Sequence, residues 1–254
     1  MVNRKREGLA TIILAAGKGT RMKSDLAKVL HPVCGRPMLT YVVELAQNLD
    51  SEKTIVVTGH QADMIKEATK GRNLIYTFQK KQLGTAHAVS RAGDNLLGFD
   101  GNVLILCGDT PLLLPSTIEA LLENHRSNSA VITVMTTILD NPGSYGRVVK
   151  SEEGDVLKIV EARDAGAEEK MIKEINTGIY CAENAFLFEA VKKIDNKNVQ
   201  GEYYFTDIFE IARREDRKTG SFIIDDPSEA MGINTIDDLK TAERIMRDRP
   251  CDKL

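Results

Sequence analysis

The chain has 254 residues, of which 42% are hydrophobic, so it can build the core of one large domain or of a domain with an added lobe. Its 34 Lys and Arg residues against 37 Asp and Glu residues give a formal net charge of −3. That charge argues against a nucleic-acid binder held by phosphate contacts.

No segment has the pattern of a membrane span or a signal peptide. The longest apolar run, residues 9–16, is far shorter than the ~20 residues that a span needs. The basic segment 1–8 lacks a signal peptide's apolar core, so we expect a cytoplasmic protein. Its cysteines are too far apart for a metal site, and we expect mostly buried thiols. They are Cys34, Cys107, Cys181 and Cys251.

The first half alternates two kinds of segment. Runs rich in Ile, Val and Leu predict strands at residues 9–16, 53–58, 73–78 and 102–107. Helix-spaced apolar residues predict helices at 36–48, 62–70 and 85–97. This alternation predicts βαβ units and a mostly parallel sheet, whose ligands bind at the carboxyl edge.

After residue 127 the pattern changes to short strands separated by turn residues, which predicts an antiparallel addition to the sheet. The predicted strands are 130–137, 145–150, 156–161, 174–182 and 220–224, and the predicted helices are 185–193, 205–214 and 235–247. Thr235 can cap the last helix, and Asp237 and Asp238 suit its first turn.

A glycine-rich segment, LAAGKGTRM at residues 14–22, follows the first strand. Its glycines allow backbone N–H groups to face a phosphate, and Arg21 and Lys28 add positive charge. Ile12 excludes a Walker A loop, and Met22 excludes a dinucleotide fingerprint. A solvated glycine-rich connection remains the alternative interpretation of this segment alone.

Further motifs follow in order along nearly the whole chain. They are KVLHP at 28–32, QLGTAHA at 82–88, GDTPL at 108–112, YGR at 145–147, VEARDA at 160–165, NTG at 176–178, GEYYFTD at 201–207 and GIN at 232–234. With these motifs the chain resembles the sugar-nucleotide pyrophosphorylases. More narrowly, it resembles the uridyltransferase domain of the bacterial bifunctional N-acetylglucosamine-1-phosphate uridyltransferase/glucosamine-1-phosphate acetyltransferases.

The resemblance implies an α/β, Rossmann-like nucleotide-diphospho-sugar transferase fold, with a mixed, mostly parallel sheet flanked by helices and a small antiparallel sugar-binding addition. We expect a nucleotidyltransferase domain at 1–234, divided into a nucleotide-binding half (9–127) and a sugar-binding half (128–234). A C-terminal helix and tail would follow at 235–254. We also expect this chain to carry no acetyltransferase domain, because no hexapeptide repeat is present.

The implied reaction joins UTP and N-acetylglucosamine 1-phosphate into UDP-N-acetylglucosamine and pyrophosphate, with Mg²⁺ as cofactor. Neither a nucleic acid nor a membrane is expected as a partner, and the oligomeric state stays open. The same chemistry with another sugar 1-phosphate or nucleotide, such as glucose 1-phosphate or dTTP, is one alternative. A non-catalytic sugar-nucleotide sensor is the other.

The resemblance also implies roles for single residues. Arg21, Lys28 and Asp109 would be catalytic, and Asp109 and Asn234 would hold Mg²⁺. Gln79 would recognise uracil, since its amide can pair with both a donor and an acceptor of a base edge. The full set of implied substrate-binding residues is Leu14, Ala15, Ala16, Gly17, Gln79, Gly84, Thr85, Gly108, Gly146, Glu161, Asn176 and Asn234.

Some residues have an ordinary alternative or depart from the family pattern. Asp109 alone reads as a turn residue and Asn234 as a helix cap. Ala27 stands where proline is common, Cys107 replaces a frequent aromatic residue, and the sequence after Asn234 is TIDDL rather than Asn-Arg. His31, His60, His87 and His125 show no ligand spacing and are interpreted as structural or surface residues.

Overall fold

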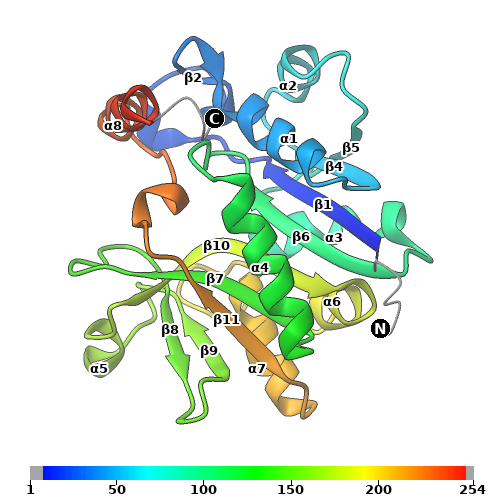
Figure 1. Ribbon diagram of the computed structural model, residues 1–254, viewed down its shortest axis with the longest axis vertical. Helices are drawn as coiled ribbons and strands as arrows, with labels where there is room; N and C mark the ends of the chain where they lie inside the picture. Colours follow the sequence, from blue (N-terminus) through cyan, green and yellow to red (C-terminus); the bar gives the residue numbers. More distant parts are fainter. Residues whose placement is uncertain (1–7, 250–254) are drawn as a thin grey trace.

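A nine-stranded mixed sheet forms the centre of the protein (Figure 1). The computed structural model describes residues 8–249. Residues 1–7 and 250–254, which include Cys251 and the outer ends of the predicted domain ranges, lie outside the described part. The strands of the sheet are β1 (Gly8–Ala15), β4 (Lys53–Thr58), β5 (Ile75–Phe78), β6 (Gly101–Cys107), β7 (Ile132–Ile138), β8 (Arg147–Lys150), β9 (Val156–Val160), β10 (Glu174–Glu183) and β11 (Thr219–Ile223).

The strand order is β11-β7-β10-β6-β1-β4-β5, and the β8–β9 hairpin attaches to β10. Strands β1, β4, β5 and β6 run parallel. In contrast, β10 runs antiparallel to both β6 and β7. The predicted α/β sheet with an antiparallel addition is therefore confirmed.

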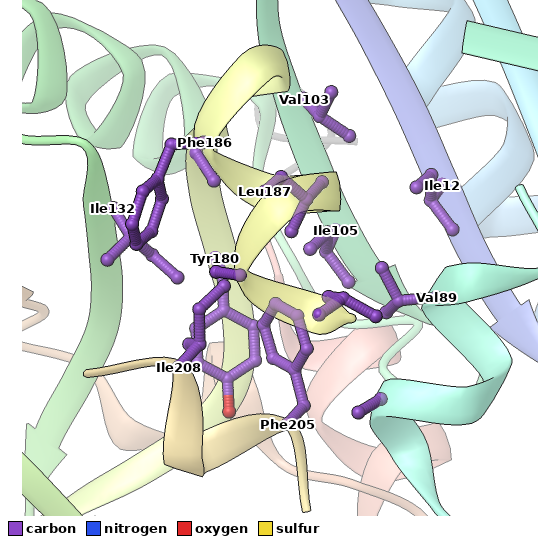
Figure 2. Packing of buried hydrophobic residues seen from close by; sticks show 14 of the residues in the cluster. Ile12, Val89, Val103, Ile105, Ile132, Tyr180, Phe186, Leu187, Phe205 and Ile208 are labelled. Carbon is purple, nitrogen blue, oxygen red and sulfur yellow. The ribbon is translucent and has the colours of Figure 1, made fainter. Parts of the chain in front are cut away.

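Helices cover both faces of the sheet. One face carries α1 (Met38–Asn48), α2 (Ala62–Ala68) and α4 (Pro115–Asn128), and the other carries α3 (Thr85–Ser90), α6 (Asn184–Val191) and α7 (Ile208–Arg214). Because successive strand residues point to opposite faces, Ile12 and Ile13 of β1 belong to different core clusters. Figure 2 shows the cluster of Ile12, in which Val89 and Leu187 pack toward the sheet. This double coverage explains why the strands read as unbroken apolar runs.

The last helix, α8 (Ile236–Asp248), returns to the first half of the chain, where it lies near β2 (Pro32–Val33) in Figure 1. Its apolar side packs with Val33, Met38 and Leu112. The predicted cap is confirmed: the Thr235 hydroxyl accepts from the Asp238 amide at 3.1 Å, and the Asp238 carboxylate accepts from the Thr235 amide at 2.8 Å.

Two helix predictions were wrong in extent, and one helix was missed. The helix predicted at 36–48 begins at Met38, because β3 (Arg36–Pro37) pairs with β2 in a small hairpin. The helix predicted at 85–97 ends at Ser90, and a separate 3₁₀ turn forms at Gly93–Leu96. Helix α4 was not predicted, although Pro115 at its first turn and its buried Ile118, Leu121 and Leu122 are helix signals.

Within residues 8–249, no helix is both long and apolar enough to cross a bilayer.

An acidic cluster surrounds Asp207, which ends a short 3₁₀ turn (Phe205–Asp207). Burial, helped by the charges of Glu210, Asp195, Glu161 and Asp164, raises the pKa of Asp207 to about 6. An unfolded Asp titrates near ~4. Between these two values the folded protein binds more protons than the unfolded chain. The free energy of unfolding therefore decreases as the pH rises through this window.

Asp207→Asn should remove this loss, because the amide carries no charge to bury. We expect the free energy of unfolding to rise by ~1 kcal/mol at pH 7, after allowance for solvent screening of this half-exposed group. Near pH 4 the variant and the parent should be equally stable. Urea denaturation at both pH values measures the difference, and an equal gain at both would contradict this account.

Leu104→Ala tests the position of the core. The Leu104 side chain is fully buried in β6, so its loss should lower the free energy of unfolding by about 2–5 kcal/mol. Leu97→Ala is the matched control, because Leu97 is 78% exposed and its loss should cost less than ~0.5 kcal/mol. Urea denaturation followed by circular dichroism compares the two, and similar losses would show the core to be elsewhere.

Candidate active site

At β1 the order in which strands are added to the sheet reverses. Strands β4 and β5 add to one side of β1, whereas β6 adds to the other side. The loops that follow β1 and β6 both leave this point of the sheet at its carboxyl edge, the usual ligand position of such sheets. The Gly108 amide donates to the Leu14 carbonyl at 2.9 Å and holds the two loop starts together.

Four of the predicted site residues meet at this edge of the sheet. The Lys28 ammonium forms an ion pair with the Asp109 carboxylate and donates to Asn234 Oδ1 at 2.8 Å. Arg21 donates to the same Asn234 oxygen at 2.7 Å. The side chains of Lys28 and Asp109 are only 17% and 16% exposed. Segments far apart in the sequence thus build one charged cluster.

The geometry of Asp109 and Asn234 suits a cation. A carboxylate oxygen and an amide oxygen both contact the Lys28 ammonium, so they converge on one point that already holds a positive charge. Hard divalent cations prefer such oxygens. Residues 8–249 contain no cluster of three or more His, Cys, Asp or Glu side chains that could hold a metal. A divalent ion at Asp109 and Asn234 would therefore need phosphate oxygens and water to complete its coordination.

The loop that carries Lys28 is held by contacts within the protein. Gly19 has a φ of +67°, and a Cβ there would lie 2.4 Å from the Cβ of Lys28, so only glycine fits. The Ala27 amide donates to Gln61 Oε1 at 2.6 Å, and Gln61 Nε2 donates to the Asp25 carbonyl at 2.7 Å. A proline at position 27 could not make the first of these bonds. Gln61, which the sequence did not indicate, thus restrains the loop.

The loop between β5 and α3 lies at the same edge. Gln79 follows β5 and is 3% exposed, and its Nε2 lies 3.2 Å from the Gly84 carbonyl and 2.9 Å from His87 Nδ1. The expectation that its amide offers both a donor and an acceptor to a base therefore needs correction. The amide nitrogen already contacts groups within the protein, so only the amide oxygen is available to a base.

Neighbouring backbone fixes the rest of this loop. Gly84 has a φ of +114°, and a Cβ there would lie 2.5 Å from the Tyr203 carbonyl oxygen. Thr85 begins α3 and is exposed. At the end of β1, Ala15 and Ala16 are buried and Gly17 is exposed.

The three residues predicted for the sugar lie in the antiparallel half. The backbone N–H of Asn176 donates to the Gly146 carbonyl at 3.0 Å, which brings these two residues together. Glu161 Oε1 accepts from the Thr206 hydroxyl at 3.2 Å. Burial raises the pKa of Glu161, the Thr206 hydrogen bond opposes this shift, and the charges of Asp164 and Glu202 add to it.

Tyr180 is influenced by both Glu161 and Asn176. Burial and the charge of Glu161 raise the pKa of Tyr180, and a hydrogen bond with the Asn176 side chain opposes this shift. The Asn176 carboxamide oxygen also accepts from the Gly178 amide at 2.9 Å. Tyr180 reads as an ordinary strand residue in the sequence, so nothing there indicated this position.

Two further residues hold the loop in front of β8. Arg147 is buried, and its guanidinium donates to the carbonyl oxygens of Tyr145 and, at 3.1 Å, Gly143. Burial raises the pKa of Tyr145, while a hydrogen bond with the Gly232 backbone opposes this shift. Tyr145 therefore lies beside the segment that ends in Asn234. The YGR motif was the available signal, but we singled out only its glycine.

Cys107 lies at the end of β6, where its thiol donates to the Gly178 carbonyl at 3.4 Å. Burial, with the Asp109 charge, raises the pKa of Cys107 to about 12, so the thiol stays protonated. Of the described cysteines, Cys34 is exposed, Cys107 is partly buried and Cys181 is buried. The expectation of a buried thiol is therefore wrong for Cys34.

Comparison with known proteins finds relatives over nearly the whole chain. The chain is 50% identical over 240 residues to the bifunctional protein GlmU of Geobacillus thermodenitrificans, covering 94% of this chain and 52% of that protein. The GlmU protein of Geobacter metallireducens is 49% identical over 242 residues, with 95% of this chain and 51% of that protein covered. The chain thus spans about half the length of these relatives. The GlmU protein of Desulfotalea psychrophila is 45% identical over 246 residues, and the match covers 97% of this chain and 73% of that protein.

Solved structures share the fold at low sequence identity. A putative glucose-1-phosphate thymidylyltransferase from Bacillus anthracis aligns with a TM-score of 0.74 and 20% identity, covering 96% of this chain and 97% of that one. A UDP-glucose pyrophosphorylase complexed with UDP-glucose aligns with a TM-score of 0.73 and 18% identity, covering 96% and 100%. The family model for nucleotidyl transferases matches residues 10–232. The chain therefore belongs to the nucleotidyl transferase family.

Proposed function

We propose that this chain transfers a uridylyl group from UTP to N-acetylglucosamine 1-phosphate, which yields UDP-N-acetylglucosamine and pyrophosphate. The convergence of Arg21, Lys28, Asp109 and Asn234 in one charged cluster carries this proposal, because the reaction gathers two polyanions around one phosphorus. The sequence motifs resemble the uridyltransferase domain, and the GlmU relatives support the same assignment.

The reaction needs no nucleophile from the protein. A phosphate oxygen of the sugar phosphate attacks the α-phosphorus of UTP in line. A new P–O bond forms, the bond from the α-phosphorus to the bridging oxygen breaks, and pyrophosphate leaves with that oxygen. Positioning and charge neutralisation supply the acceleration in such transfers.

Arg21 and Lys28 would bind the phosphates. In the free protein their charges face Asn234 and Asp109. Phosphate oxygens bound at this cluster would offer both cations a partner with more negative charge, so Lys28 would turn toward the substrate. Asp109 and Asn234 would then hold Mg²⁺, which supplies further neutralisation of the phosphate oxygens.

The sugar would lie against β8, β9 and β10. Gly146 offers backbone without a side chain in the way, and the partly buried Glu161 carboxylate can accept from sugar hydroxyls. The Asn176 side chain can bond a hydroxyl or the acetamido oxygen. We also propose that the reaction takes place in the cytoplasm, which agrees with the biosynthetic role that the GlmU relatives support.

A panel of substrates tests the proposal. The purified chain is given UTP, dTTP or CTP with N-acetylglucosamine 1-phosphate or glucose 1-phosphate, and pyrophosphate release is measured with Mg²⁺ or with EDTA. We expect the highest kcat/KM for UTP with N-acetylglucosamine 1-phosphate, and no reaction in EDTA. A higher value for glucose 1-phosphate or dTTP would reassign the substrates. Absence of pyrophosphate from every pair would favour a sugar-nucleotide sensor.

Asp109→Asn tests the charged cluster. The change keeps the shape of the side chain but removes the charge that faces Lys28 and would hold the metal. Turnover should fall by ~10²-fold or more at saturating Mg²⁺, whereas thermal unfolding should still be cooperative.

Asn234→Ala should lose less turnover than Asp109→Asn, because water can replace a neutral ligand. Asp63→Asn, on the fully exposed start of α2, is the control and should keep parental turnover. Parental turnover in Asp109→Asn would exclude this role.

A further inference from the structure

The orientation of the Gln79 amide can be deduced from its neighbours. A backbone carbonyl can only accept, so the amide group 3.2 Å from the Gly84 oxygen must be the NH₂ group. That nitrogen is also 2.9 Å from His87 Nδ1. Since an NH₂ group only donates, Nδ1 must accept. His87 is therefore neutral and carries its proton on Nε2.

The surroundings of His87 favour this neutral form. Burial and the charge of Arg91 lower the pKa of His87. His87 also lines a cavity of about 480 Å³ between α3 and α6, together with Asp94 and an ion pair of Lys192 with Glu189 at 2.8 Å. A protonated ring would place an N–H group against the NH₂ group of Gln79. The hydrogen bond and the neutral ring thus support each other.

Because the nitrogen of Gln79 faces the protein, its oxygen is left for the nucleotide. Within the described part of the chain no donor contacts this oxygen. Uracil and thymine carry a hydrogen on N3, whereas N3 of cytosine is an unprotonated acceptor. An amide oxygen therefore binds the first two bases and meets a repelling lone pair on the third. It cannot distinguish uracil from thymine.

We propose that His87 is a positioning residue that sets base selectivity: by accepting from Gln79, it keeps the amide oxygen toward the base and so favours UTP over CTP. This inference rests on the proposed uridylyl transfer. It assigns a function to a histidine that the sequence indicated only as structural. It also predicts that His87 has no influence on the choice between UTP and dTTP.

Three variants test the inference by steady-state pyrophosphate release with UTP, CTP and dTTP. His87→Ala removes one of two acceptors of the Gln79 amide, so the ratio of kcat/KM for UTP to that for CTP should fall about tenfold. The ratio for UTP to dTTP should stay at its parental value. His87→Asn should restore the first ratio, since asparagine Oδ1 and histidine Nδ1 are both bonded to Cγ.

Ser90→Ala is the matched control in the same helix. The Ser90 hydroxyl donates only to the His87 carbonyl, at 2.8 Å, so its loss should change neither ratio. A general loosening of α3 would instead lower activity with all three nucleotides alike. Such a uniform loss in His87→Ala, or parental ratios in that variant, would overturn the inference.

A second measurement does not depend on activity. Long-range ¹H–¹⁵N NMR spectra of the free protein at neutral pH report which His87 nitrogen carries the proton. We expect the neutral ring with its proton on Nε2, and a proton on Nδ1 would overturn the inference. A parent enzyme that does not prefer UTP to CTP would instead remove the proposed function itself. A parent that prefers UTP, with the same preference in His87→Ala, would remove only the role of His87.

Discussion

The arrangement of the site depends on the Lys28 ammonium and the two oxygens that it contacts. Lys28 belongs to the loop after β1, Asp109 follows β6, and Asn234 precedes α8. Breaking a largely buried ion pair at one partner leaves the other charge without compensation, so these segments favour each other's position. In the free protein the cluster is therefore organised before a substrate binds. Preorganised charge of this kind is what phosphoryl transfer requires.

The last helix shows how much of the site comes from outside the sheet. The Ile233 amide donates to the Asp109 carbonyl at 3.0 Å, and the Asp238 carboxylate accepts from the Asn234 amide at 2.9 Å. The sequence after Asn234, which departs from the family pattern, thus supplies the cap that fixes Asn234. Helix α8 is anchored in turn by its apolar contact with the first half. A residue that alone reads as a helix cap becomes part of the charged cluster through this packing.

Sequence alone predicted those features that follow from local pattern. The strands of the parallel half were placed to within about two residues, because double burial makes them unbroken apolar runs. Their order along the chain also predicted a carboxyl edge carrying Lys28 and Asp109. What the sequence could not give are contacts between distant side chains. The bonds from Gln61 to Asp25 and Ala27, and the pairing of Gln79 with His87, exist only once loops from different strands lie side by side.

The antiparallel direction of β10 explains how a candidate sugar-binding residue reaches the same edge of the sheet as Asp109. Tyr180 pairs with Ile105 in an antiparallel register, so the amino-terminal end of β10 lies beside the carboxyl end of β6. Asn176 is thereby brought to the edge where Asp109 follows β6. The register of β10 with β7 also shifts between Asn176 and Tyr180, and such irregularities re-aim side chains. A parallel β10 would carry Asn176 to the opposite edge. One reversal of direction in the sheet thus places candidate sugar-binding and phosphate-binding residues within reach of a single substrate.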